Sequence, residues 1–208
     1  MSSRIRLGCA LFAVTLSALG ACVSPADRFD EFAERVVDAQ ANTIDGSGGL
    51  FEIDGEFLLA LVPSFAVNNT LRFIVTADIT IEGDSGTLDL EIQPIKVDRC
   101  EPAGNGGEPV GDPLETTGVA VSEVGGFEIT HDGAMVTAEA NDVTCGDIVA
   151  DLVLIGQIRS ADMFCGDVTG RVTAPLPNDL EGSTFGAIRI EPGTTGDDDL
   201  PEPLKACP

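Results

Sequence analysis

The sequence predicts an all-β domain: an antiparallel meander of about eight strands forming a barrel or a sandwich, with one short N-terminal helix. Two observations lead to this prediction. From residue 50 onward, apolar residues alternate with polar ones, which is the spacing of strands with one buried face. Turn-forming clusters separate these runs, and no helical periodicity interrupts them. With 43% hydrophobic and 22% charged residues, the chain is expected to bury one core.

The first 21 residues are typical of an export signal. Arg4 and Arg6 give a positive start, and an apolar stretch of 15 residues follows from position 7 to position 21. A stable membrane-spanning helix needs about 20 residues, so this stretch is too short to remain as an anchor. We therefore expect residues 1–21 to be removed.

Leu19-Gly20-Ala21-Cys22 ends this signal and resembles the lipobox of bacterial lipoproteins. The resemblance covers the first 22 residues. It implies that the Cys22 thiol is diacylated, that the chain is cut before it, and that the new amine is acylated. It places the protein in the bacterial cell envelope, and Val23 resembles the pattern that sorts lipoproteins to the outer membrane. The alternative is an ordinary secretory signal, with Cys22 as a spare thiol.

An amphipathic helix is predicted over residues 24–40. Ser24 and Pro25 suit its start, and Phe29, Phe32 and Val36 lie on one face at helical spacing. We expect this face to plug or cover the β-core. The predicted organisation is then a signal peptide (1–21), a lipidated N-terminus with the helix (22–49), and an all-β domain with an acidic tail (50–208).

Eight strands are predicted after the helix. They cover residues 50–62, 71–82, 87–97, 116–123, 126–140, 147–160, 163–174 and 183–191, with a break at Asp132-Gly133. The Gly- and Pro-rich segment 99–115 and the tail from residue 192 are expected to be solvated loops.

Four cysteines follow Cys22, and export makes disulfides between them the expectation. A hairpin about residues 161–162 places Cys165 about 13 residues, or ~43 Å of strand, from Cys145, so these two cannot pair. Strand direction favours Cys100 with Cys145 and Cys165 with Cys207 if residues 116–140 form one strand down and one strand up. If 124–126 and 131–133 are both hairpin turns, this assignment fails.

The charge excludes some partners. Residues 1–21 contain two arginines and no acid, so 9 of the 11 basic residues remain against 35 acidic ones, a formal charge of −26. Nucleic acid is excluded as a partner because the basic residues are scattered singly. Docking of the protein surface onto anionic lipid is disfavoured, which leaves the acyl chains as the membrane contact. A salty habitat is an alternative explanation of the acidity.

No catalytic residue, cofactor or metal site is predicted. Gly83-Asp84-Ser85-Gly86 resembles the nucleophile motif of chymotrypsin-like proteases, but it departs from that motif at Thr87. His131, the only histidine, also follows the motif rather than preceding it, so a hairpin turn explains the residues better. The chain has no closely spaced cysteine pair of the kind that binds zinc. The aspartates at 197–199 lack the spacing of a calcium-binding loop.

The C-terminal part carries a second resemblance. Cys165-Gly166-Asp167, continuing through Pro175 to Phe185, is similar to a pattern in uncharacterised lipoproteins of myxobacteria and their relatives. It implies an envelope location and no particular chemistry.

Three functions follow as hypotheses. The first is a non-catalytic, monomeric envelope protein with a structural or interaction role, whose partner would be another envelope protein. The alternatives are a carrier that holds a small apolar ligand in a barrel, and a hydrolase that uses paired carboxylates. The expected inward residues are large, so the sequence predicts a solid interior and no co-purifying small molecule; they are Leu71, Phe73, Val75, Ile79, Leu88, Leu90, Ile92, Leu152 and Leu154.

Overall fold

The computed structural model describes residues 50–99, 106–196 and 199–208. Cys22, Cys100 and the helix expected over residues 24–40 lie outside the described residues. Within the described ranges the chain is all-β, as predicted, and no helix in them is long and apolar enough to cross a membrane.

The described strands correspond to the eight predicted segments, but several ends differ: the segment predicted from residue 50 begins at Gly55, and the one predicted to residue 97 ends at Pro94. The strands are β1 (Gly55–Val62), β2 (Leu71–Glu82), β3 (Ser85–Pro94), β4 (Leu114–Val121), β5 (Gly126–Val136), β6 (Ile148–Ser160), β7 (Met163–Ala174), β8 (Asn178–Asp179) and β9 (Ser183–Arg189). The two-residue β8 was not predicted. The predicted strand 126–140 stops at Val136, and Ala138–Ala140 form a 3₁₀ turn instead.

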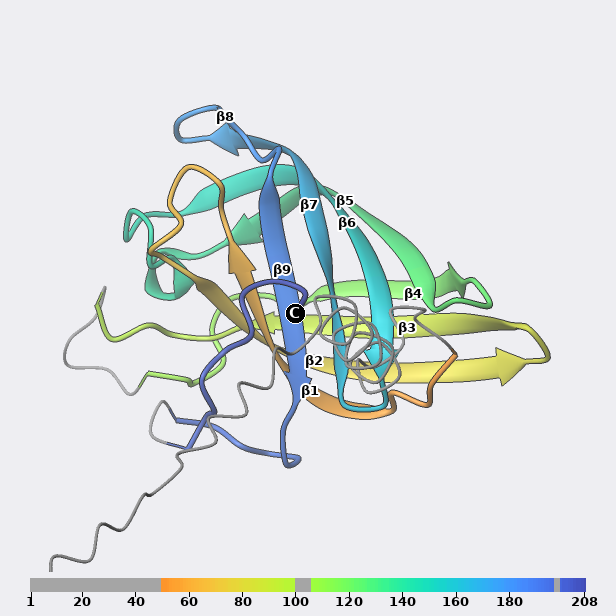
Figure 1. The fold of residues 1–208 in the computed structure, drawn as a ribbon. Helices are drawn as coiled ribbons and strands as arrows, with labels where there is room; N and C mark the ends of the chain where they lie inside the picture. The colour runs from red at the N-terminus through yellow and green to blue at the C-terminus, as the bar shows by residue number, and fades with distance from the viewer. Residues whose placement is uncertain (1–49, 100–105, 197–198) are drawn as a thin grey trace, which may run out of the picture. The chain divides into compact units, whose positions relative to one another are not determined.

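The strands form a barrel that is nearly closed (Figure 1). The hydrogen-bonded order is β4-β3-β2-β1-β9-β7-β6-β5, every pairing is antiparallel, and β8 adds to β7. Apart from β4 and β5, each barrel strand pairs with the next barrel strand along the chain, and the β1–β9 ladder joins the two halves. This is the order of an up-and-down barrel. The seam lies between β4 and β5, which share a turn but no ladder.

The β-strand alternation places one face of each strand in the core. On β2, Leu71, Phe73, Val75 and Ile79 are buried, as the sequence predicted. Deeper in the barrel, the ring of Phe164 meets three other rings edge-on, with centroids 5.1 Å from Phe57, 6.0 Å from Phe127 and 6.5 Å from Phe185. These rings fill the middle of the interior.

The two ends of the barrel differ. At one end the short turns β2–β3, β4–β5 and β6–β7 come together, and Leu50 and Ile53 pack there, Ile53 fully buried and Leu50 over Gly86. We call this the closed end. At the other end lie the longer connections 63–70, 95–113 (described in part), 137–147 and 175–182, and we call this end the mouth.

The C-terminal tail is fixed to the outside of the barrel. Cys165 on β7 forms a disulfide with Cys207, with a Cα–Cα distance of 5.3 Å, which confirms that predicted pair. The hydroxyl of Thr184 also donates to the carbonyl of Lys205 over 2.8 Å. Although Cys165 points away from the core, the tail buries it completely.

Only one member of the other predicted pair, Cys100–Cys145, lies among the described residues. Cys145 is disulfide-bonded, and Cys100 lies outside the described residues. Asp132-Gly133 forms a bulge within β5 rather than a hairpin turn. Residues 116–140 therefore run down and back once, which is the condition that the predicted pairing required.

Candidate functional site

The residues that the sequence singled out do not assemble into a catalytic site. Ser85 begins β3 at the closed end, where its hydroxyl donates to the carbonyl of Glu82 over 3.3 Å, as expected for a hairpin turn. His131 lies on β5 and is hydrogen-bonded to the hydroxyl of Thr116 on β4 over 3.1 Å. Among the described residues, no group of three or more His, Cys, Asp and Glu is placed to hold a metal ion.

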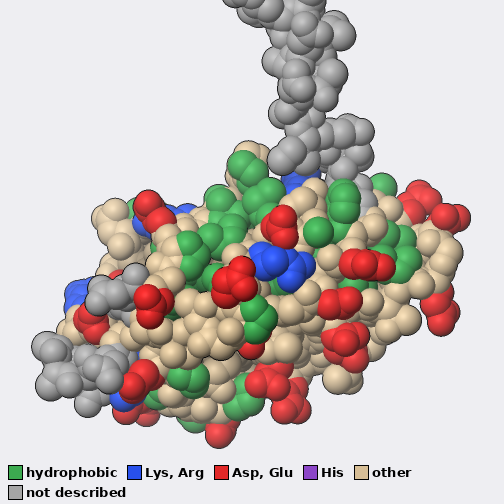
Figure 2. All heavy atoms as spheres, turned by 90° about the horizontal axis from the view of Figure 1, so that it is seen from below, with side chains coloured by type: hydrophobic (Ala, Val, Ile, Leu, Met, Phe, Trp, Pro, Cys, Tyr) green, Lys and Arg blue, Asp and Glu red, His purple; other side chains and the backbone are tan. Residues whose placement is uncertain are grey.

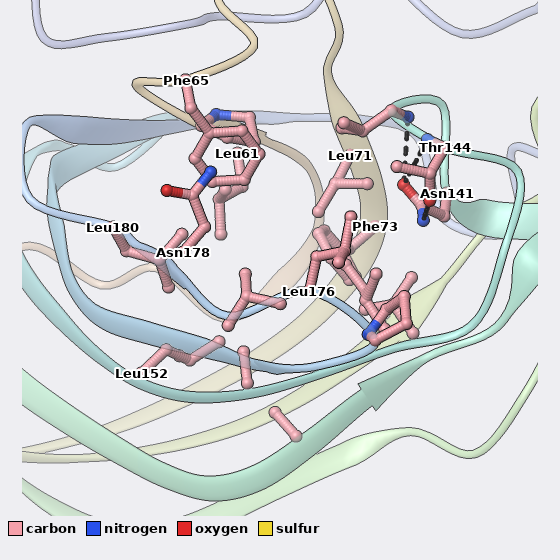
Figure 3. A pocket seen from close by; sticks show the side chains of 18 of the residues that line it. Leu61, Phe65, Leu71, Phe73, Asn141, Thr144, Leu152, Leu176, Asn178 and Leu180 are labelled. Atoms are coloured by element: carbon pink, nitrogen blue, oxygen red, sulfur yellow. Dashed lines mark hydrogen bonds between the residues drawn. The ribbon is translucent and has the colours of Figure 1, made fainter.

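The mouth contains an apolar cavity of about 250 Å³. Its walls are inward side chains of β1, β2, β4, β5, β6 and β7, together with residues of the connections 63–70, 137–147 and 175–182 (Figure 3). The cavity is partly open to solvent. The largest lining residues are Phe65 and Phe73, and Leu61, Leu71, Ile148 and Leu152 lie beside them. The interior is therefore not solid throughout, whereas the sequence predicted a solid interior. Half-buried Leu152, predicted to fill the core, faces this cavity instead.

Small side chains in one register row explain the cavity. Ala134 on β5 pairs with Ala150 on β6, and Ala150 pairs with Val172 on β7. All three are buried and line the cavity. Deeper along the same strands the inward positions carry Phe127 and Phe164, which fill the space. The step from phenyl rings to alanine leaves room at the mouth.

The polar lining is sparse and neutral. Asn141 is fully buried, but its side chain is used within the 137–147 connection: its NH₂ donates to the Thr144 hydroxyl (2.7 Å) and to the Gly146 carbonyl (2.6 Å). Thr144 and Asn178 are exposed and lie on opposite sides of the view in Figure 3, with Leu71 and Leu176 between them. No charged side chain in the described ranges lines the cavity.

Carboxylate pairs do exist, but they lie on the outer face of the sheet. Asp78 is the register partner of Asp89, and Glu91 is the partner of Glu115, so like charges face each other across β2, β3 and β4. All four side chains are exposed. They are not part of the cavity, and they form no enclosed site of the kind that a hydrolase with two carboxylates uses.

The seam between β4 and β5 holds a half-buried histidine. Burial lowers the pKa of His131 below its usual value of 6.5, because the charged imidazolium loses hydration there. The neutral ring and Thr116 then join β4 and β5 through side chains, where no backbone ladder does.

Comparisons of the chain with protein-family models, with curated proteins and with solved structures find no match. The geometry of the mouth is therefore the basis for a functional interpretation.

Proposed function

We propose that this chain is a lipid-anchored, non-catalytic protein of the bacterial cell envelope that binds a small, uncharged, apolar molecule in the mouth of its barrel. The apolar cavity carries the proposal. It favours the carrier over the purely structural role that the sequence alone favoured. Anchoring through acyl chains on Cys22, at the outer membrane, completes the proposal and rests on the lipobox resemblance.

The cavity suits a ligand of modest size. A hydrophobic cavity of about 150 Å³ lined by Leu, Ile and Phe stays dry and binds benzene. By the same measure, 250 Å³ takes about ten non-hydrogen atoms. A water molecule in the cavity would form few hydrogen bonds, because it needs two to four polar partners and the walls offer almost none. An apolar molecule would recover the dispersion contacts that the walls of an empty cavity lack.

Charge selects against ionised ligands. A buried carboxylate or ammonium needs a partner of opposite charge, and the described lining offers none. Carboxylates are further disfavoured because the molecule carries a formal charge of −24. A single hydroxyl or carbonyl at the outer end of the ligand could meet Thr144 or Asn178 at the rim.

The lining also supports binding rather than catalysis. Within the described ranges, no lining side chain is a carboxylate, a histidine, a lysine or a cysteine. General acid–base or nucleophilic chemistry draws mainly on these groups. The Thr144 hydroxyl accepts a hydrogen bond from Asn141, which is not a base.

Filling the cavity tests the carrier function. We expect the chain from residue 24, which retains every described strand, to bind 1-decanol at a ratio of one to one in a calorimetric titration. Ala150→Phe places a ring in the cavity and should weaken binding at least about tenfold. Ala120→Phe adds the same ring at an exposed position of β4 and should bind like the wild type. Wild-type protein that binds no decanol, or an Ala150→Phe variant with unchanged affinity, would contradict the proposal.

Acylation tests the anchor. In cells fed a fatty-acid analogue, the wild-type chain should carry the label, and Cys22→Ala should lose it and move from the membrane fraction to the soluble fraction. Label that persists in Cys22→Ala would refute lipidation at this residue.

A further inference from the structure

Exposed apolar side chains surround the mouth. Phe65 and Val67 lie in the connection between β1 and β2, and Leu176 lies between β7 and β8. Their exposed fractions are 43%, 61% and 76%. Single exposed apolar residues are ordinary on protein surfaces. Here, however, Phe65 and Leu176 also line the cavity, so the rim and the cavity form one continuous apolar surface.

The first of these connections and the start of the second carry no charge, whereas the exposed Asp179 and Glu181 follow later in the second connection. Residues 63–70 and 172–178 contain no acidic or basic side chain, although the chain has 35 acids among its 208 residues. The other two connections are charged: Asp142 of 137–147 accepts a hydrogen bond from Asn69 and forms an ion pair at 3.6 Å with Arg99 of 95–113. The mouth therefore has an uncharged arc on a strongly acidic molecule.

We propose that this arc, formed by residues 63–70 and 172–178, docks on the surface of a bilayer of uncharged lipids, so that the cavity opens into the membrane. The proposal extends the proposed function, because the apolar ligand would then pass between bilayer and cavity without crossing water. Burial of the three side chains in the interface provides the attraction. The acidic remainder of the surface disfavours anionic headgroups.

The shape of the rim favours a bilayer over a protein partner. The exposed residues sit on separate connections, and the one that carries β8 projects beyond the barrel (Figure 1). A lipid interface can close around projecting side chains, whereas a stable protein interface needs a complementary and well-packed surface. A second copy of the chain, packed rim to rim, is the competing occupant that the experiment must detect.

Single tryptophans make the docking directly measurable, because the chain has no Trp and no Tyr. Phe65→Trp and Leu176→Trp place the probe on the rim. Val124→Trp is the matched control, since Val124 is 46% exposed in the β4–β5 turn at the closed end. The lipid-free chain from residue 24 is mixed with phosphatidylcholine vesicles, with and without brominated acyl chains, which quench a tryptophan that enters the bilayer.

We expect quenching of the two rim probes and none of the control. Adding phosphatidylglycerol to the vesicles should weaken binding, and sodium chloride should not weaken binding to pure phosphatidylcholine. No quenching of the rim probes, or equal quenching of all three, would overturn the proposal. So would rim probes that change only with protein concentration in the absence of vesicles, because that result indicates a second copy.

Two further variants separate docking from ligand binding. Replacing Val67, which lies on the rim but does not line the cavity, by serine should lower partitioning into phosphatidylcholine vesicles severalfold. Decanol affinity in solution should not change. Ala150→Phe should have the reverse effect. Its affinity for decanol should fall, whereas a Leu176→Trp probe in this variant should still be quenched by brominated lipid. Loss of vesicle binding in Ala150→Phe, with the serine variant unaffected, would contradict the docking proposal alone.

Discussion

Ala150 and Gly156 lie on the same inward face of β6, yet they have opposite effects on the interior. A Cβ at Gly156 would stand 2.2 Å from the Phe127 ring, so only glycine lets that ring fill the middle of the barrel. Ala150 carries only a methyl group, and the space beside it is part of the cavity. Side-chain size at two positions therefore separates a solid zone from an open one.

His131 should make folding stability depend on pH. Its pKa is lowered in the folded state, so the unfolded chain binds the proton first. The stabilisation is complete above about pH 6.5 and is lost as the pH falls through the lowered pKa of the folded state. We expect urea denaturation, followed by circular dichroism at pH 7.5 and 5.5, to show a smaller acid-induced loss in His131→Gln than in the wild type.

The difference between the wild type and His131→Gln isolates the contribution of the histidine to the pH dependence of stability. Protonation of the many carboxylates also changes stability with pH, but it does so in both. Identical pH profiles would show that His131 is not the group responsible.

At the scale of elements, the strands could be predicted because alternation and turn residues are local signals. The inward residues of β2 and β3 were identified correctly for this reason, and Gly83-Asp84 does turn the chain between them. β8 escaped prediction because two residues carry no periodicity. The 3₁₀ turn at Ala138–Ala140 interrupts a stretch whose pattern continues that of β5.

The cavity could not be predicted from single strands. It depends on Ala134, Ala150 and Val172 lying at one level, and that level is set by the register between β5, β6 and β7. The bulge at Asp132-Gly133 helps to set that register. The signal in the sequence is the pair of alanines at expected inward positions of neighbouring strands, which indicates a cavity only once the strands are aligned.

The disulfide at the outer face should contribute much of the stability of the tail and β7. Cys165 and Cys207 are separated by 42 residues, and closing a loop of that length in the unfolded chain contributes about 4 kcal/mol in the chain-entropy model. We expect the double variant Cys165→Ala, Cys207→Ser to lose about 3–4 kcal/mol of unfolding free energy in urea. A loss below about 1 kcal/mol would indicate that the tail is held by packing alone.

At the scale of the whole molecule, acidic side chains dominate the surface. Figure 2 shows them spread over one face with few basic groups among them. The formal charge is −24, and like charges face each other at Asp78–Asp89 and Glu91–Glu115. Such cross-strand pairs are destabilising. The net charge was known from the sequence, whereas these pairings required the register of the barrel.

Salt should therefore stabilise the fold. Raising sodium chloride from 0.05 to 0.5 M shortens the screening length from about 14 Å to about 4 Å. We expect the unfolding free energy to rise by about 1 kcal/mol, since repulsion within the folded state is reduced. Glu91→Gln removes one member of a facing pair and should show a weaker salt dependence. A fall in stability with added salt would contradict this explanation.

The place where the described chain begins bears on how the protein can be handled. Leu50 packs over Gly86 at the closed end, at the pole opposite the cavity. The described lining of the cavity begins only at Leu61. A tag or surface linker joined ahead of Leu50 would therefore enter the barrel away from the cavity and leave the mouth accessible to ligands in an immobilised binding assay.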